Sequence, residues 1–438
     1  MPTARADSYS VVSGQSLTAG RNNVSNGVWT PAKDASGRIL AASVASTPLN
    51  EWVQVADTSL MAIRSALLAL PQPYDITSST DNKGNGRDVM TTLNAWVGCC
   101  VDEATGTVYI GPGGGHNDSS CDGLWALDLW KMQWRVEAPP LKPSDSLSPW
   151  SAEYLANSAG GGWTDYRPKP TSPADEVTFD WPDFIPWAAD GTPRGPTSRH
   201  TYNGCYFDSA RGEVVSTRIA LWRWNVASKT WTRTRPIIAG SPEPIDVDGG
   251  GQAVYHAGTD RAIGTFARHR TYVSKPDELA YFNGNNPTRV NLSQTVGSPV
   301  SNNNHAWVRI DDDTVLAVGN GGGGGVVYGY LNLATLSRPQ GAAAVSGGVQ
   351  SAADMPALFY EPENNKVVRR LTGSGVNGTW REINLSTMAE TAHTPVGNAP
   401  PMGTYPGNKY FRFPAWKGVI AIAPTNDTTP CVYFKRTG

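Results

Sequence analysis

The residues best suited to binding or chemistry begin six short apolar segments of the chain. In each segment a polar residue is followed by an apolar stretch, and a turn comes eight positions after the polar residue. These leading residues are Asn94, His200, Gln252, His305, Asp354 and Lys409. Their amide, imidazole, carboxylate and ammonium groups donate and accept hydrogen bonds, which suits a polar ligand such as a sugar. The alternative is a solvated rim whose polar residues only cap strand ends.

Five further residues complete the predicted ligand site. They are His116, Asn117, Asp118, Trp163 and Arg199. The first three follow a run of glycines, where they either bind a ligand or form a tight turn. Trp163 belongs to an aromatic, Pro-rich insertion at 137–198, which either packs on the rest of the fold or offers flat faces to a sugar or partner.

The elements that must position these residues repeat along the chain. In one repeated turn, Asp bonds backbone amides and Gly takes a positive φ, as in DEATG (102–106), DSARG (208–212) and DRAIG (260–264). A second strand is predicted after each leading segment, at TVYIG, EVVST, TFAR, TVLAVGN, KVVRRL and GVIAIA. Outermost strands are predicted at QWRVEAP (133–139), TWTRTRP (230–236), PTRVNL (287–292) and TWREINL (379–385).

This repeat predicts an all-β fold, a closed β-propeller of about six four-stranded blades. A spacing of roughly 30 to 60 residues suits propeller blades, and a blade hidden in the insertion would make seven. EWVQVAD (51–57) precedes the first unit, whereas the last unit, ending CVYFKRTG, has no outer strand after it. The N-terminal strand is therefore predicted to complete the last blade, because closure removes exposed sheet edges. The leading residues would then encircle one mouth of the central channel.

The start of the chain is predicted to differ from the propeller. Residues 1–50 form an arm with few large apolar groups, extended or poorly packed unless a partner orders it, and residues 51–438 form the propeller. Asp57 is predicted to cap a short helix over 58–70, which packs on the propeller. Its apolar face would consist of Leu60, Ile63, Leu67 and Leu70.

Two stretches resemble kelch repeats. PTSRHTYNGCYFDSARGEVV has the Arg and His that open such a blade, with Trp231 later in the same unit. GPGGGHNDSSCDGLWALDLWKMQWRV (111–136) and GNGGGGG (319–325) have the Gly pair that follows the second strand. The GGGHND form is similar to kelch-type propellers of bacterial proteins and tailed-phage virions. The resemblance implies a virion-associated structural or receptor-binding protein, made in the host cytoplasm, that recognises a glycan or another protein subunit.

Composition and charge exclude several partners. A net charge of −2, with 17% charged residues, gives no basic excess, so nucleic acid is not a predicted partner. The start of the chain has no signal-peptide pattern and no apolar run is long enough to span a bilayer, so no membrane insertion is predicted. Five cysteines with no zinc spacing favour free thiols in a reducing cytosol, with no metal or cofactor.

Cysteine placement leaves one disulfide open. Cys99 and Cys205 occupy the same position of the repeat, which predicts buried packing rather than nucleophilic chemistry. A disulfide between Cys100 and Cys121 remains an alternative.

Two enzyme classes stay as alternatives to a non-enzymatic recognition protein. A polysaccharide lyase needs a base, an acid and a cation, which SRHTY (198–202) or ARHRTY (267–272) would offer. A copper radical oxidase would use a pair such as Tyr255 and His256, but no second matching histidine follows. We therefore assign no catalytic residue, and the lyase is the runner-up.

Overall fold

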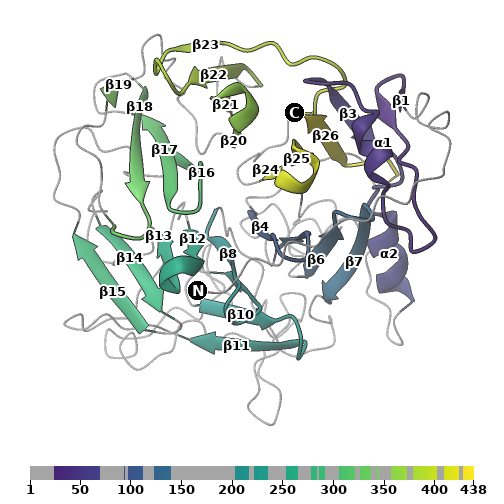
Figure 1. Cartoon of the computed structure of the whole chain (residues 1–438). Helices are drawn as coiled ribbons and strands as arrows, with labels where there is room; N and C mark the ends of the chain where they lie inside the picture. The colour runs from purple at the N-terminus through teal and green to yellow at the C-terminus, as the bar shows by residue number, and fades with distance from the viewer. Residues whose placement is uncertain are drawn as a thin grey trace, which may run out of the picture.

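The structure is a computed structural model that describes sixteen stretches of the chain. They are residues 24–69, 93, 97–111, 123–139, 203–216, 221–234, 253–264, 278–283, 286–291, 305–320, 326–336, 343–344, 357–371, 378–401, 409–423 and 428–438. These residues form small β-sheets that are arranged as the blades of a propeller around a central axis (Figure 1).

Five of the sheets have four strands each. The first two contain β4 (Cys99–Asp102), β5 (Thr107–Ile110), β6 (Leu124–Asp128) and β7 (Gln133–Ala138), then β8 (Cys205–Asp208), β9 (Glu213–Ser216), β10 (Leu221–Asn225) and β11 (Thr230–Thr234). The third contains β12 (Ala253–His256), β13 (Arg261–Gly264), β14 (Glu278–Asn283) and β15 (Asn286–Asn291). The fourth and fifth contain β16 (His305–Arg309), β17 (Thr314–Asn320), β18 (Val326–Asn332) and β19 (Ala343–Ala344), then β20 (Ala357–Glu361), β21 (Lys366–Arg370), β22 (Trp380–Asn384) and β23 (Glu390–Ala392).

The sixth sheet has six strands and carries both ends of the described chain. Its order is β1-β2-β3-β26-β25-β24. The members are β1 (Val24–Ser25), β2 (Val28–Trp29), β3 (Trp52–Val55), β24 (Tyr410–Phe413), β25 (Gly418–Ile422) and β26 (Val432–Arg436). The predicted number of about six four-stranded blades is therefore wrong, because the N-terminal hairpin extends this sheet. The five four-stranded blades do not close a ring, so the predicted closed propeller of four-stranded blades is not what the structure shows.

The predicted pairing of the N-terminal strand is confirmed. β3 lies antiparallel to β26, with Val53 opposite Phe434 and Trp52 opposite Lys435. The short strand β2 then pairs with β3 in parallel. Residues 24–50 of the predicted arm are thus packed against the propeller, and Trp29 is fully buried. Residues 1–23 lie outside the described residues.

Two predicted strands differ from the structure. TWREINL contains β22, which is the third strand of its blade, because the short strand β23 adds an outer edge. In the third blade the second strand is β13, at residues 261–264, and not the later TFAR. The outer strands predicted at 133–139, 230–236 and 287–292 are confirmed as β7, β11 and β15.

Two kinds of turn recur between the first two strands of the blades. In the first blade Asp102 accepts hydrogen bonds from Ala104 N and Thr105 Oγ1, and Gly106 has a φ of 67°, as predicted. In the third blade Asp260 ends the 3₁₀ turn η3 (Ala257–Thr259) with a left-handed φ of 49°. The prediction that Asp260 starts the third copy of the turn is therefore wrong. Similar left-handed residues follow η4 (Pro362–Asn364) and η5 (Pro414–Trp416).

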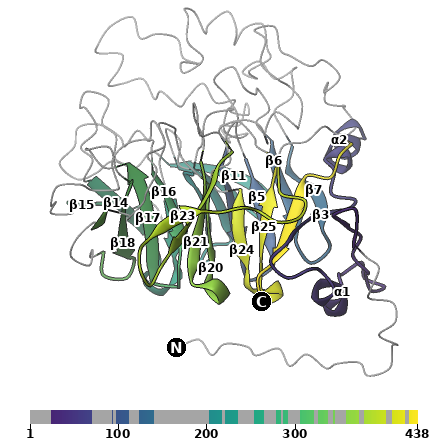
Figure 2. The ribbon, with the colours of Figure 1, turned by 90° about the horizontal axis from the view of Figure 1, so that it is seen from above.

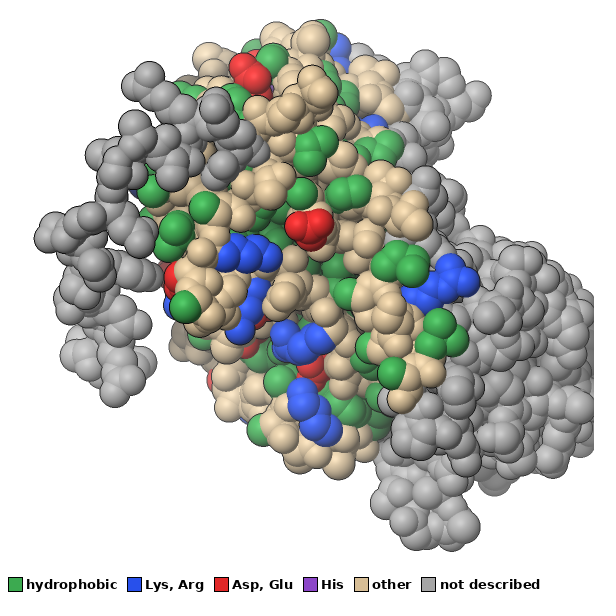
Figure 3. All heavy atoms as spheres, turned by 90° about the vertical axis from the view of Figure 1, so that its right-hand side faces the viewer, with side chains coloured by type: hydrophobic (Ala, Val, Ile, Leu, Met, Phe, Trp, Pro, Cys, Tyr) green, Lys and Arg blue, Asp and Glu red, His purple; other side chains and the backbone are tan. Residues whose placement is uncertain are grey.

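Two helices lie along the same edge of the propeller, toward opposite faces (Figure 2). They are α1 (Ala41–Ala45) and α2 (Met61–Leu68). Leu60, Ile63 and Leu67 are buried, as predicted for the apolar face of the second helix. Asp57 does not cap it, because the helix starts later, after Leu60, and has no side-chain cap. Around these helices, hydrophobic and charged side chains are interspersed on the surface (Figure 3).

Apolar clusters and polar bridges hold neighbouring sheets together. In the described residues, hydrophobic clusters lie between each consecutive pair of sheets, including the six-stranded sheet and the first blade. Arg211 of the second blade bonds Asp260 of the third through two nitrogens, at 2.7 and 2.8 Å. His256 of the third blade contacts Asp313 of the fourth at 2.8 Å. No helix in the described part of the chain is long and apolar enough to cross a membrane.

Candidate functional site

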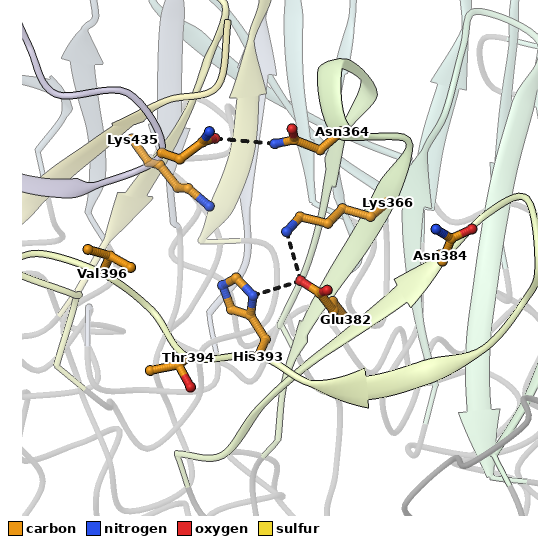
Figure 4. Close-up of a pocket in the computed structure, with 9 residues that line it drawn as sticks. Asn364, Lys366, Glu382, Asn384, His393, Thr394, Val396 and Lys435 are labelled. Carbon is orange, nitrogen blue, oxygen red and sulfur yellow. Dashed lines mark hydrogen bonds and ion pairs between the residues drawn. The ribbon is translucent and has the colours of Figure 1, made fainter.

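A polar pocket lies between the fifth blade and the six-stranded sheet. It has a volume of about 370 Å³ and is shown in Figure 4. We call it the inter-sheet pocket; it is lined by Asn50, Asn364, Lys366, Glu382, Asn384, His393, Thr394, Val396 and Lys435. Most of these side chains carry hydrogen-bonding groups, so the pocket is suited to a polar ligand.

Strand register brings the first charged pair of the pocket together. Lys366 of β21 lies opposite Asn384 of β22, and Val368 lies opposite Glu382. Lys366 and Glu382 are thus diagonal neighbours on one face of the sheet, within reach of long side chains. Lys366 Nζ donates a hydrogen bond of 2.7 Å to Glu382 Oε2.

The segment after β23 adds a histidine to this pair. His393 Nδ1 lies 2.8 Å from the same Glu382 oxygen, and the dashed lines from Lys366 and His393 in Figure 4 meet at that carboxylate. The segment then joins the six-stranded sheet, because Trp52 N donates to Val396 O at 2.9 Å. His393 is therefore fixed between the two sheets, with about 10% of its side chain exposed.

A second ion pair spans the two sheets. Lys435 of β26 donates from Nζ to Glu361 Oε1 of β20 at 2.6 Å. Both side chains are buried, with exposed fractions of 3% and 0%. Asn364 Nδ2 bonds the other oxygen of Glu361 at 3.0 Å and Asn50 Oδ1 at 3.2 Å. A buried carboxylate and ammonium are tolerated here because each has a charged partner and further hydrogen bonds.

The pKa directions define the charge state of the pocket. Burial opposes ionisation of Glu382, but the hydrogen bonds from Lys366 and His393 outweigh it and lower the pKa of Glu382. Burial also lowers the pKa of His393, only partly offset by the bond to Glu382, and the charges of Lys435 and Lys366 lower it further. At neutral pH Glu382 is therefore ionised and His393 neutral.

This charge state fixes the tautomer of the histidine. Neutral His393 donates its Nδ1 proton to ionised Glu382, which leaves Nε2 as an acceptor. Nε2 is buried and has no hydrogen-bond partner among the described residues. The described residues also contain no group of His, Cys, Asp and Glu that could hold a metal ion. Chemically, the pocket offers hydrogen-bond donors and acceptors with its charges already paired.

A smaller hollow, of about 230 Å³, lies among inner strands of the first, fourth, fifth and sixth sheets. Its walls include Trp307, Leu358 and Phe411, and charged residues such as Glu103 and Asp312 lie at its edge. Asp312 is fully exposed. The lining of this hollow has more apolar side chains than that of the inter-sheet pocket, and its Arg309 donates to the backbone oxygens of Asp311 and Asp312.

The predicted ligand residues mostly lie outside the described residues. These are Asn94, His116, Asn117, Asp118, Trp163, Arg199, His200, Gln252 and Asp354. His305 starts β16, but its side chain is also outside the description. Lys409 is described and is fully buried, and its Nζ donates to Leu93 O at 2.6 Å. Burial lowers the pKa of Lys409 to about 7.

The structure describes four of the five cysteines. Cys99 and Cys205 are buried at the first positions of β4 and β8, which confirms the predicted packing. Cys99, Cys100 and Cys205 form no disulfide with one another or with Cys431, the other described cysteine. Cys121 lies outside the described residues, so its pairing with Cys100 stays untested.

Sequence reasoning missed the residues of the inter-sheet pocket. Lys366 and Glu382 lie in the predicted strands KVVRRL and TWREINL, which also contain arginines, so these two charged residues did not stand out. Nothing comparable marks His393, which follows an outer strand, or Lys435, which comes from the far end of the chain. Their meeting depends on how the fifth blade and the six-stranded sheet pack together.

Comparisons with known proteins identify no family for this chain. No protein-family model matches the chain, and no curated protein matches it. Similar solved structures include TolB from Acinetobacter baumannii, with 10% identity, a TM-score of 0.33 and coverage of 67% of this chain and 52% of that chain. The chain thus spans about half of TolB.

Two other solved structures are similar over most of their length. A gluconolactonase from Xanthomonas campestris has 9% identity, a TM-score of 0.39 and coverage of 79% of this chain and 87% of that one. An oligogalacturonate lyase in complex with manganese has 11% identity, a TM-score of 0.34 and coverage of 78% and 91%. Identities and TM-scores this low carry no argument about activity. What the structure shows is an all-β, propeller-like arrangement of small sheets.

Proposed function

We propose that the protein is a recognition module, a β-propeller that binds a glycan in the inter-sheet pocket. The observation that carries this proposal is the combination of a cavity of about 370 Å³ with a wall of amide, carboxylate, ammonium and imidazole groups. Sugars present many hydroxyls, each of which donates and accepts hydrogen bonds. A wall with both donors and acceptors suits them better than an apolar or single-sign wall would.

We further propose that this module belongs to a tailed-phage virion, as a structural or receptor-binding protein of the kelch type. This part of the proposal rests on the GGGHND stretch and the kelch-like segments of the sequence. A protein subunit remains the alternative partner. Antibody labelling of purified phage particles would test the virion placement. Particles that do not contain the protein would overturn it.

A blocking variant tests binding in the inter-sheet pocket. Val396 lines the pocket and is 52% exposed, so Val396→Trp should fill the pocket without disturbing the core. Leu68→Trp is the matched control, because Leu68 is 44% exposed on α2 and is not part of the pocket lining. On an array of bacterial surface oligosaccharides we expect the wild type and the Leu68 variant to bind the same glycan, and the Val396 variant to bind it at least tenfold more weakly.

An absorbance assay separates recognition from the lyase alternative. Acidic polysaccharides incubated with the wild type should show no growth of the absorbance of an unsaturated product. Growth of that absorbance, with loss in His200→Ala, would replace the recognition proposal by the lyase. Equal glycan binding by the wild type and the Val396 variant would instead move the binding site elsewhere.

A further inference from the structure

The charges in the inter-sheet pocket cancel within the protein. Lys366 is bonded to Glu382 at 2.7 Å, and Lys435 is bonded to Glu361 at 2.6 Å. Lys366 Nζ also lies 3.8 Å from the second oxygen of Glu361. Each ammonium therefore already has at least one carboxylate, and a bound anion would compete with carboxylates that are held in place by the sheets.

The partly exposed carboxylate in the pocket lining is that of Glu382. About 31% of its side chain is exposed, whereas Glu361 is fully buried. Its Oε2 atom accepts the bonds from Lys366 and His393, so Oε1 keeps capacity to accept. An approaching hydroxyl can donate to this oxygen, whereas an approaching carboxylate would meet like charge.

Three charged groups of the pocket wall act on His393. Glu382 on β22 bonds its Nδ1, and Lys366 on β21 and Lys435 on β26 lie near enough to disfavour its protonation. Trp380 packs beside its ring, with centroids 6.2 Å apart. The unpartnered Nε2 is turned away from Glu382 in Figure 4. Because an unsatisfied buried acceptor costs free energy, a ligand hydroxyl that reaches it would add to affinity.

Resting on the proposed function, we propose that the inter-sheet pocket selects an uncharged, polyhydroxylated sugar over an acidic sugar. Glu382 is the specificity-determining residue, because it accepts from ligand hydroxyls and neutralises Lys366. His393 is a positioning residue that holds the carboxylate of Glu382 through Nδ1. Its second nitrogen is a further acceptor for the same ligand.

The selectivity should depend on pH through the histidine. When His393 takes up a proton, the pocket gains one positive charge and Nε2 changes from an acceptor to a donor. Burial lowers the pKa of His393, so this change occurs below the ordinary histidine range. The preference for uncharged sugars should therefore be constant at neutral pH and should decline as the pH falls through the pKa of His393.

The test uses acidic oligosaccharides and their carboxyl-reduced forms, which differ only where a carboxylate becomes a hydroxymethyl group. Calorimetry on the full chain should show at least tenfold tighter binding of the reduced, uncharged form at pH 7.5. In Glu382→Gln, Lys366 loses its carboxylate at 2.7 Å and keeps only the oxygen of Glu361 at 3.8 Å, so the preference should fall at least tenfold or reverse. In His393→Gln, the residual preference should no longer change with pH.

Glu213→Gln is the matched control. Glu213 forms a similar ion pair in the second blade, 3.2 Å from Arg223, and Arg223 keeps Asp208 at 3.5 Å. This variant should keep the wild-type preference and its pH dependence. Tighter binding of the acidic forms by the wild type, still blocked by Val396→Trp, would overturn the selectivity but keep the proposed function. Binding of neither form would overturn both.

Discussion

The buried lysine at position 409 offers the most quantitative test of the structure. Its side chain is fully buried, its Nζ donates to Leu93 O at 2.6 Å, and the loss of hydration lowers its pKa to about 7. Replacement by methionine, Lys409→Met, keeps the length and apolar stem of the side chain and removes the titrating group. The variant therefore isolates the free energy of burying an amine at this place.

The size of the effect follows from the two pKa values. The lysine pKa is 10.5 when unperturbed and about 7 in the fold. At about 1.4 kcal/mol per pKa unit, keeping the lysine buried costs about 4 kcal/mol at pH 7. Between pH 7 and the unperturbed value, the unfolded chain binds more protons than the folded chain. The stability of the wild type should therefore rise by about this amount as the pH rises through that window.

The difference in stability between Lys409→Met and the wild type should reverse sign as the pH rises. Methionine removes the pH-dependent cost but leaves the Leu93 carbonyl without its donor, a loss of about 1–3 kcal/mol. At pH 7 the variant should be the more stable protein, and near pH 10.5 it should be the less stable one. Urea unfolding of both proteins across this pH series measures the difference. If the difference in unfolding free energy between the two proteins does not change with pH, the conclusion that Lys409 is buried with a lowered pKa is refuted.

Four further outcomes are expected. Glu361→Gln leaves buried Lys435 without its carboxylate and should cost about 3–5 kcal/mol in urea unfolding, whereas loss of an exposed pair would cost under about 1 kcal/mol. Trp52→Ala opens the core beside β26 and should cost about 3–5 kcal/mol by the same measurement. Hydrogen bonds from Arg211 and Tyr255 lower the pKa of Asp260 to about 2. In acid unfolding, the modest stabilisation of the fold by this carboxylate should therefore be lost as the pH falls toward 2. Burial raises the pKa of Cys99 to about 12, so a thiol reagent should label it only after unfolding.

The sequence was informative where a local pattern repeats. The alternation of apolar residues and the Asp and Gly turns located most strands, and the missing outer strand at the C-terminus led to the correct partner for Trp52. Local patterns did not reveal the hairpin of β1 and β2, because these two-residue strands are too short to show a period. The number of four-stranded blades was wrong for that reason.

The candidate site was much harder to predict. The polar residues that lead the inner strands stood out because they recur, yet Lys409, the one whose side chain is described, is buried and bonded to a backbone carbonyl. The inter-sheet pocket has no counterpart in the repeat. It forms where β22, the segment after β23 and β26 meet, and the position of Lys435 against Glu361 depends on the packing of two sheets. A single sequence does not reveal such contacts.

The most direct test of a ligand in the inter-sheet pocket is hydrogen–deuterium exchange with and without a bound carboxyl-reduced oligosaccharide. Ligand binding should slow exchange in peptides that cover 366–384 and 393–396, and these peptides should be unaffected in Val396→Trp. Slowed exchange confined to other peptides, with unchanged exchange in these two, would contradict the account.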